Sequence, residues 1–255
     1  MRIATWNVNS LSVRLPQVLD WMARHSPDVL ALQETKMEDQ RFPVEVFLEA
    51  GYEVLFSGQK AYNGVALISR RAATDPGFEL PEFDDPQRRV LAATIEGLRI
   101  INLYVPNGSE VGSDKYRYKL AWLSALNCWL TEERIRYPRL IVLGDFNIAP
   151  SDCDVHDPDR WRGQILCSAP ERGAFETLIA LGFKDAFRCF EQPEASFTWW
   201  DYRLNGFRRN LGLRIDHILI SETLIGALAG CGIDREMRGL ERPSDHAPVF
   251  LDLSD

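Results

Sequence analysis

The chain has 255 residues, a hydrophobic content of 45% and a formal net charge of −8. This length and apolar content suffice for one large core, so residues 1–255 are expected to form a single α/β domain. No apolar run reaches the ~20 residues that span a bilayer, and no membrane partner is expected. Five scattered cysteines without a CxxC pair favour reduced thiols and a cytoplasmic location.

Short apolar segments alternate with amphipathic helical segments along the chain. Their β-branched content predicts strands at residues 2–6, 28–32, 64–69, 89–95, 99–104, 139–143, 214–220 and 247–253. Helical spacing of leucines and other apolar residues predicts helices around 15–22, 120–130 and 175–179. The short link at residues 96–98 predicts an antiparallel hairpin, whereas strands joined through helices are expected to pair in parallel. We therefore expect mixed sheets.

Polar side chains stand where several predicted strands begin or end. Those that follow a strand are Asn7, Glu34, Asp145 and Asn147, and those that precede the last strand are Asp245 and His246. If the last strand runs antiparallel to the others, all of these side chains reach one edge of the sheets. Each has a structural explanation when taken alone, as a turn cap, a helix start or the end of a Gly-Asp turn. Their convergence favours a functional site.

Asp216 lies within the otherwise apolar strand RIDHILI and needs a partner there. Of the four histidines, His25 ends a predicted helix and His156 lies in a loop. His217 is next to Asp216 and points to the opposite face of the strand. This leaves His246 as the expected partner of Asp216.

The ligand types at this edge favour a hard cation. Carboxylate and amide oxygens without a Cys/His cluster indicate Mg²⁺ or Mn²⁺ rather than zinc. Glu34, with Asp245 or Asn7 near it, matches the sparse protein ligation that Mg²⁺ prefers. A metal, a carboxylate-oriented histidine and further acids together can direct water at a phosphodiester.

Two basic stretches and one irregular stretch complete the pattern. Residues 115–119 interleave cations with aromatics, and residues 203–214 hold four arginines without an acid. Both can be solvated faces, but two such runs beside an acidic site also suit phosphate contacts. Residues 149–172 have little periodicity, and a loop of that length is expected to be either functional or disordered.

Seven sequence blocks occur in the order found in one enzyme family. They are TWNVNS, LQETK, YNGVALISR, LGDFNIAP, FTWWDYR, GLRIDHIL and RPSDHAPV. Over essentially its whole length the chain resembles the exonuclease III family of AP endonucleases, within the endonuclease/exonuclease/phosphatase superfamily. The resemblance implies a four-layer α/β sandwich, in which two packed mixed β-sheets are flanked by helices as in DNase I.

The resemblance also implies roles for the polar residues at the sheet edge. Asn7 and Glu34 look like metal-site residues, with Asp245 as an additional ligand. Asp216 and His246 look like the Asp–His pair at the scissile phosphate. Asp145 and Asn147 look like the pair that positions or activates the attacking water, with Asp145 as our choice of general base.

Further residues look like substrate contacts by their position in the motifs. Tyr104 and Asn107, in LYVPNG, resemble phosphate-contacting residues of the family, and Tyr104 is also expected to take part in catalysis. Trp199 is expected to line a pocket for an extruded sugar or to stack against DNA, and Trp200 to lie in the core. Arg89 and Lys119 resemble phosphate contacts, although exposed charges at strand and helix ends would explain them equally well.

The expected function is that of a DNA repair nuclease that hydrolyses phosphodiesters of double-stranded DNA at abasic sites and at recessed or blocked 3′ ends. Such an enzyme combines AP endonuclease, 3′→5′ exodeoxyribonuclease and 3′-phosphatase activities, and a monomer suits it. One alternative is a 3′-end-specific exonuclease or 3′-phosphatase without abasic incision. More distant alternatives are a phosphatase or lipid phosphodiesterase of the superfamily and a non-catalytic DNA-binding module on the same fold.

Overall fold

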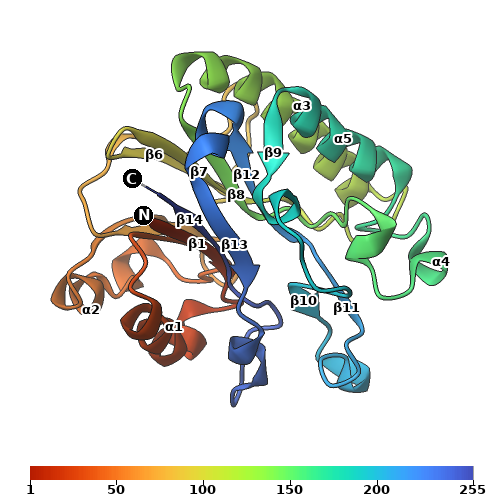
Figure 1. Cartoon of the computed structure of the whole chain (residues 1–255), viewed down its shortest axis with the longest axis horizontal. Helices are drawn as coiled ribbons and strands as arrows, with labels where there is room; N and C mark the ends of the chain where they lie inside the picture. Colours follow the sequence, from red (N-terminus) through yellow and green to blue (C-terminus); the bar gives the residue numbers. More distant parts are fainter. Residues whose placement is uncertain (255) are drawn as a thin grey trace.

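Two six-stranded β-sheets pack against each other (Figure 1). The computed structural model describes residues 1–254. The first sheet contains, in spatial order, β13 (Leu228–Ile233), β14 (Val249–Leu253), β1 (Arg2–Asn7), β2 (Val29–Gln33), β4 (Val65–Ser69) and β3 (Glu53–Ser57). The second contains β5 (Thr74–Gly77), β6 (Val90–Ile95), β7 (Leu98–Tyr104), β8 (Leu140–Asp145), β12 (Asp216–Ser221) and β9 (Phe183–Asp185). A separate ribbon pairs β10 (Trp199–Trp200) with β11 (Gly212–Leu213).

Helices cover the outer faces of both sheets. The first sheet packs against α1 (Leu11–His25) and α2 (Val44–Glu49), and the second against α3 (Asp114–Arg136) and α5 (Ala169–Ala180). In β1, Ile3 faces the opposite sheet, whereas Ala4 and Trp6 belong to the cluster under α1, as the alternation of a strand requires. The expected four-layer α/β sandwich is therefore confirmed. Among residues 1–254, no helix combines the length and apolar character needed to cross a membrane.

Each predicted strand overlaps an observed one, and the sheets are mixed as expected. β1 pairs in parallel with β2 and antiparallel with β14. The β6–β7 hairpin turns on Glu96 and Gly97, whose φ angles of 50° and 75° give the two left-handed positions of a two-residue turn. The sequence did not predict β3, β5, β9, β10, β11 or β13. In β13, LAGCGI, two glycines weaken the strand signal.

The stretch 149–172 is ordered and partly helical, which corrects the expectation of a long irregular loop. It contains a 3₁₀ turn at Asp152–Asp154, the short α4 (Pro158–Trp161) and the start of α5. Ser168 caps α5 in a reciprocal pair with Glu171. The 3₁₀ turn and α4 are only three and four residues long, so they left no recognisable periodicity in the sequence.

Candidate active site

The polar side chains predicted at strand ends meet at one edge of the two sheets. Asn7 is the last residue of β1, and Glu34 directly follows β2. Asp145 ends β8, and antiparallel pairing places Asp216 of β12 opposite it. Because β14 runs antiparallel to β1, the segment before β14 brings His246 to the same edge.

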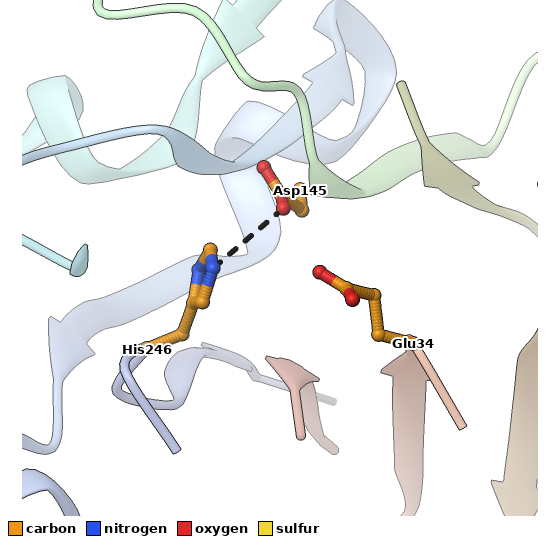
Figure 2. A group of neighbouring side chains, drawn as sticks. All are labelled: Glu34, Asp145 and His246. Carbon is orange, nitrogen blue, oxygen red and sulfur yellow. Dashed lines mark ion pairs between the residues drawn. The ribbon is translucent and has the colours of Figure 1, made fainter. Parts of the chain in front are cut away.

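Glu34, Asp145 and His246 point toward one another and form a compact cluster (Figure 2). One potential ligand atom of each residue lies within 4.8 Å of the others, and His246 Nε2 is 3.8 Å from Asp145 Oδ2. The carboxylate oxygens of this cluster suit a hard divalent cation better than zinc, because zinc sites usually take more Cys or His ligands. The donor set present here can therefore hold a metal ion.

Asn7 and Lys36 hold the Glu34 carboxylate in place. Asn7 Nδ2 donates to both Glu34 Oε1 and Asp145 Oδ2 at 2.9 Å, and Lys36 Nζ lies 2.8 Å from Glu34 Oε2. Glu34 has a φ of 52°, a left-handed conformation that costs energy for a residue with a side chain. Asn7 thus contacts the cluster through its amide nitrogen, and its role at a metal stays a prediction. Lys36 was not singled out in the sequence, and only its place in LQETK could have suggested it.

The expected Asp216–His246 pair is present. His246 Nδ1 lies 2.8 Å and 3.1 Å from the two carboxylate oxygens of Asp216, and both side chains are buried. Burial alone would lower the pKa of His246, but the negative charges of Asp216 and Asp145 prevail and raise this pKa to about 10. The imidazole is therefore cationic at neutral pH, and its Nε2–H faces Asp145 and the cluster.

Burial raises the pKa values of both Asp145 and Tyr104, with different consequences at neutral pH. Burial raises the pKa of the Asp145 carboxyl to about 7, against the opposing charge of His246. Asp145 can thus gain and lose a proton near neutral pH, as a general base must. Burial, followed by the charges of Glu34 and Asp145, raises the pKa of Tyr104 well above its usual value. Tyr104 therefore keeps its proton and can donate a hydrogen bond.

Asn107 and Asn147 form one hydrogen-bonded unit beside Asp145. Asn107 Nδ2 donates to Asn147 Oδ1 at 3.0 Å, and Asn147 Nδ2 donates to the Val105 carbonyl at 3.0 Å. The backbone N–H of Asn147 donates to Asp145 Oδ1 at 2.9 Å. This unit links the segment after β7 to the segment after β8 and fixes the orientation of the Asp145 carboxylate.

A cavity of about 480 Å³ adjoins the cluster on the side of Tyr104. Arg89, Tyr104 and Asn107 line it, and the Arg89 guanidinium lies 4.6 Å from the centre of the Tyr104 ring. Their contact with a substrate stays a prediction. Lys115 at the start of α3 also lines the cavity. The cavity can therefore accept an anion between Arg89 and Lys115.

Lys119 does not reach this cavity, which corrects its prediction as a phosphate contact. Its side chain is fully buried and ion-paired with Glu171, which is equally buried. Lys115, one helical turn earlier on α3, is the lysine that lines the cavity. The basic run 115–119 was recognised in the sequence, but the sequence did not show which of its cations is covered.

Trp199 and Asp245 lie on the other side of the site. Trp199 Nε1 donates to Asp245 Oδ2 at 3.0 Å, and Asn9 Nδ2 donates to Asp245 Oδ1 at 2.9 Å. Asp245 is not among the three clustered ligand residues, so its role as a metal ligand stays a prediction. Trp199 lines a second cavity of about 550 Å³ together with Trp161, Leu211 and basic residues, whereas Trp200 is fully buried as expected.

Comparisons with known proteins agree with this geometry. Residues 4–246 match the model of the Endonuclease/Exonuclease/phosphatase family. The chain is 36% identical over 268 residues to exodeoxyribonuclease III of Haemophilus influenzae, covering 99% of this chain and 100% of that protein.

Two solved structures are similar over their full length and that of this chain. One is a 3′ phosphatase from Neisseria bound to a product DNA hairpin, with a TM-score of 0.98 and 48% identity. The other is an AP endonuclease from Archaeoglobus fulgidus, with a TM-score of 0.96 and 38% identity.

Proposed function

Because this chain belongs to the endonuclease/exonuclease/phosphatase family, we propose that it is a metal-dependent DNA repair nuclease. It hydrolyses DNA phosphodiesters at 3′ ends and on the 5′ side of abasic sites. The observation that carries this proposal is the cluster of Glu34, Asp145 and His246, with His246 held by Asp216. A non-catalytic DNA-binding module has no need of a buried acid and an imidazole whose pKa values are shifted in this way.

Each residue of the cluster has its own role in the proposed hydrolysis. Asp145 orients the attacking water and accepts its proton, and Asn147 holds the Asp145 carboxylate in position. His246, held by Asp216 and cationic, stabilises the negative charge that develops on the phosphate oxygens. Tyr104 donates a hydrogen bond to the same phosphate from the other side.

The metal is proposed to be Mg²⁺ or Mn²⁺. Glu34 would hold it, with Asn7 and Asp245 as the further ligands that the sequence motifs suggest. Bound there, the cation supplies positive charge to the phosphate and to the leaving oxygen. Carboxylate oxygens are the ligands that these hard cations prefer, and this preference supports Mg²⁺ or Mn²⁺.

The substrate is proposed to be double-stranded DNA with abasic sites or with recessed or blocked 3′ ends. The cavity beside Arg89 and Lys115 is suited to a backbone phosphate. The cavity beside Trp199 is lined by aromatic side chains and by Arg160. An abasic nucleotide has lost its pairing, so moving it out of the helix costs little.

A second candidate is the same chemistry restricted to 3′ ends. The similar Neisseria structure is a 3′ phosphatase, and its 48% identity and TM-score of 0.98 favour this alternative. The two candidates share the cluster and differ only in whether an internal abasic nucleotide can enter the site.

Two labelled duplexes distinguish the candidates, one with an internal abasic-site analogue and one with a recessed 3′ end. The purified protein with Mg²⁺ is expected to cut 5′ to the abasic site and to shorten the 3′ end, and EDTA is expected to stop both reactions. Asp145→Asn provides the matched inactive variant. Digestion of the 3′ end alone would establish the second candidate. Binding without turnover of either duplex would contradict the proposed function.

A further inference from the structure

A fully buried lysine–glutamate pair contacts the backbone of two residues of the proposed active site. Lys119 lies on α3 and Glu171 on α5, and neither side chain has any exposed surface. Burial is the largest influence on Lys119 and lowers its pKa, while the charge of Glu171 opposes this effect. A buried ion pair of this kind often adds little stability compared with apolar residues of similar size. Its presence therefore suggests a purpose other than packing.

The ammonium of Lys119 uses all three of its donors on protein acceptors. Lys119 Nζ donates to the Asn147 carbonyl at 2.7 Å, to the Asn107 carbonyl at 3.2 Å and to Glu171 Oε1. An ammonium has three donors, so none is left for a substrate. Two of the three acceptors belong to the backbone of the unit that orients Asp145.

Glu171 anchors this ammonium to the segment before α5. Its Oε1 accepts from the Leu166 N–H at 3.1 Å, and its Oε2 accepts from Ser168 N at 3.1 Å and Ser168 Oγ at 2.6 Å. With these bonds, the pair joins four segments, namely α3, the start of α5 and the segments that follow β7 and β8. Ser168 and Leu166 also limit where Glu171 can move.

The two asparagines depend on such an anchor because their segments are irregular. Asn147 has a φ of 49°, which an isolated segment would adopt only at a cost. Gly108, next to Asn107, has a φ of 90°, and a Cβ there would lie 2.9 Å from Ile165 Cδ1 and 3.1 Å from Lys119 Cδ. The backbone beside Asn107 therefore approaches the Lys119 side chain closely.

We propose that Lys119, held by Glu171, is a positioning residue that fixes Asn107 and Asn147, and through them Asp145, for DNA hydrolysis. This inference rests on the proposed nuclease function. Lys119 has no donor left for DNA and contacts the site through the two asparagine carbonyls, so its loss lowers the rate of the chemical step and leaves DNA binding nearly unchanged.

The test replaces both charges at once, in Lys119→Met combined with Glu171→Gln. Removing the pair together leaves no unpaired buried charge, and glutamine can still cap the helix after Ser168. The matched control is Arg99→Met combined with Glu133→Gln. This second buried pair, with Nε and Oε2 3.0 Å apart, joins the same helix α3 to the start of β7, whereas Tyr104 at the site ends that strand.

The Lys119/Glu171 variant is expected to lower kcat by about 10- to 100-fold, since small displacements of catalytic groups have effects of that size. Its KM for DNA should stay within about threefold of wild type. The control pair should leave both constants nearly unchanged. Thermal unfolding of each variant verifies the fold.

The control pair separates positioning from a general structural effect, because it also removes a buried ion pair of α3 but does not contact Asn107 or Asn147. Equal losses of kcat in the Lys119/Glu171 and control variants, or an unchanged kcat in the Lys119/Glu171 variant, would overturn the inference. Failure of wild-type protein to cleave DNA with Mg²⁺ would instead overturn the proposed function.

Discussion

Replacing His217 by glutamine is expected to reduce the loss of folding stability on mild acidification. His217 lies on β12 next to Asp216 and is buried on the opposite face of the strand. Its Nδ1 lies 3.0 Å from Arg214 Nη1, and its Nε2 lies 2.9 Å from the Ile148 carbonyl. Because a guanidinium can only donate, Nδ1 accepts from Arg214 and Nε2–H donates to Ile148, which requires the neutral ring.

The size of the effect follows from the pKa of His217. Burial, followed by the positive charge of Arg214, lowers this pKa from 6.5 to about 4, against the weaker attraction of Asp185 and Asp154. In the unfolded chain the histidine takes up a proton below its ordinary pKa, whereas in the folded protein it stays neutral. Its contribution to stability is therefore complete above pH 6.5 and is lost as the pH falls toward 4. At about pH 4.5 this loss is about 2.5 kcal/mol.

The effect is measured by urea denaturation in the presence of EDTA, at about pH 7.5 and at about pH 4.5, with tryptophan fluorescence as the signal. The free energy of unfolding of the wild type should fall by about 2.5 kcal/mol more than that of His217→Gln. Asp145, with its raised pKa, takes up a proton in the folded state over the same range and adds stability as the pH falls. That contribution is present in both proteins and cancels in the difference. Equal pH dependence of the two proteins would refute the neutral, buried state of His217.

Three substitutions test the proposed active site. His246→Ala is expected to lower kcat by at least about 100-fold with little change in thermal unfolding, and wild-type turnover would remove the Asp216–His246 pair from the mechanism. Glu34→Ala should raise the Mg²⁺ concentration needed for half-maximal activity, which an unchanged titration would contradict. Trp199→Ala should reduce cleavage at an abasic site more than removal of a 3′ end. Equal losses on the two substrates would reject Trp199 as the wall of a pocket.

The sequence predicted those parts of the site that depend on local patterns. A carboxylate inside an apolar strand requires a partner, and this requirement correctly paired Asp216 with His246. The resemblance of FTWWDYR chose Trp199 over Trp200 as a pocket wall, and in the structure Trp200 is buried while Trp199 lines a cavity. The order of strands and helices also predicted correctly that the sheets are mixed. A hairpin makes its two strands antiparallel, and a helical connection allows two strands to run parallel.

The parts that depend on distant contacts could not be predicted. Lys115 and Lys119 are one turn apart on α3, and nothing within the helix distinguishes the lysine that lines a cavity from the one that is buried. The residues that cover Lys119 are Asn147, 28 positions away, and Glu171, 52 positions away. Only the folded arrangement brings them together. The same contacts that hide Lys119 from DNA place its charge against the asparagine carbonyls, so the failed prediction of a phosphate contact and the proposed positioning role have a single structural cause.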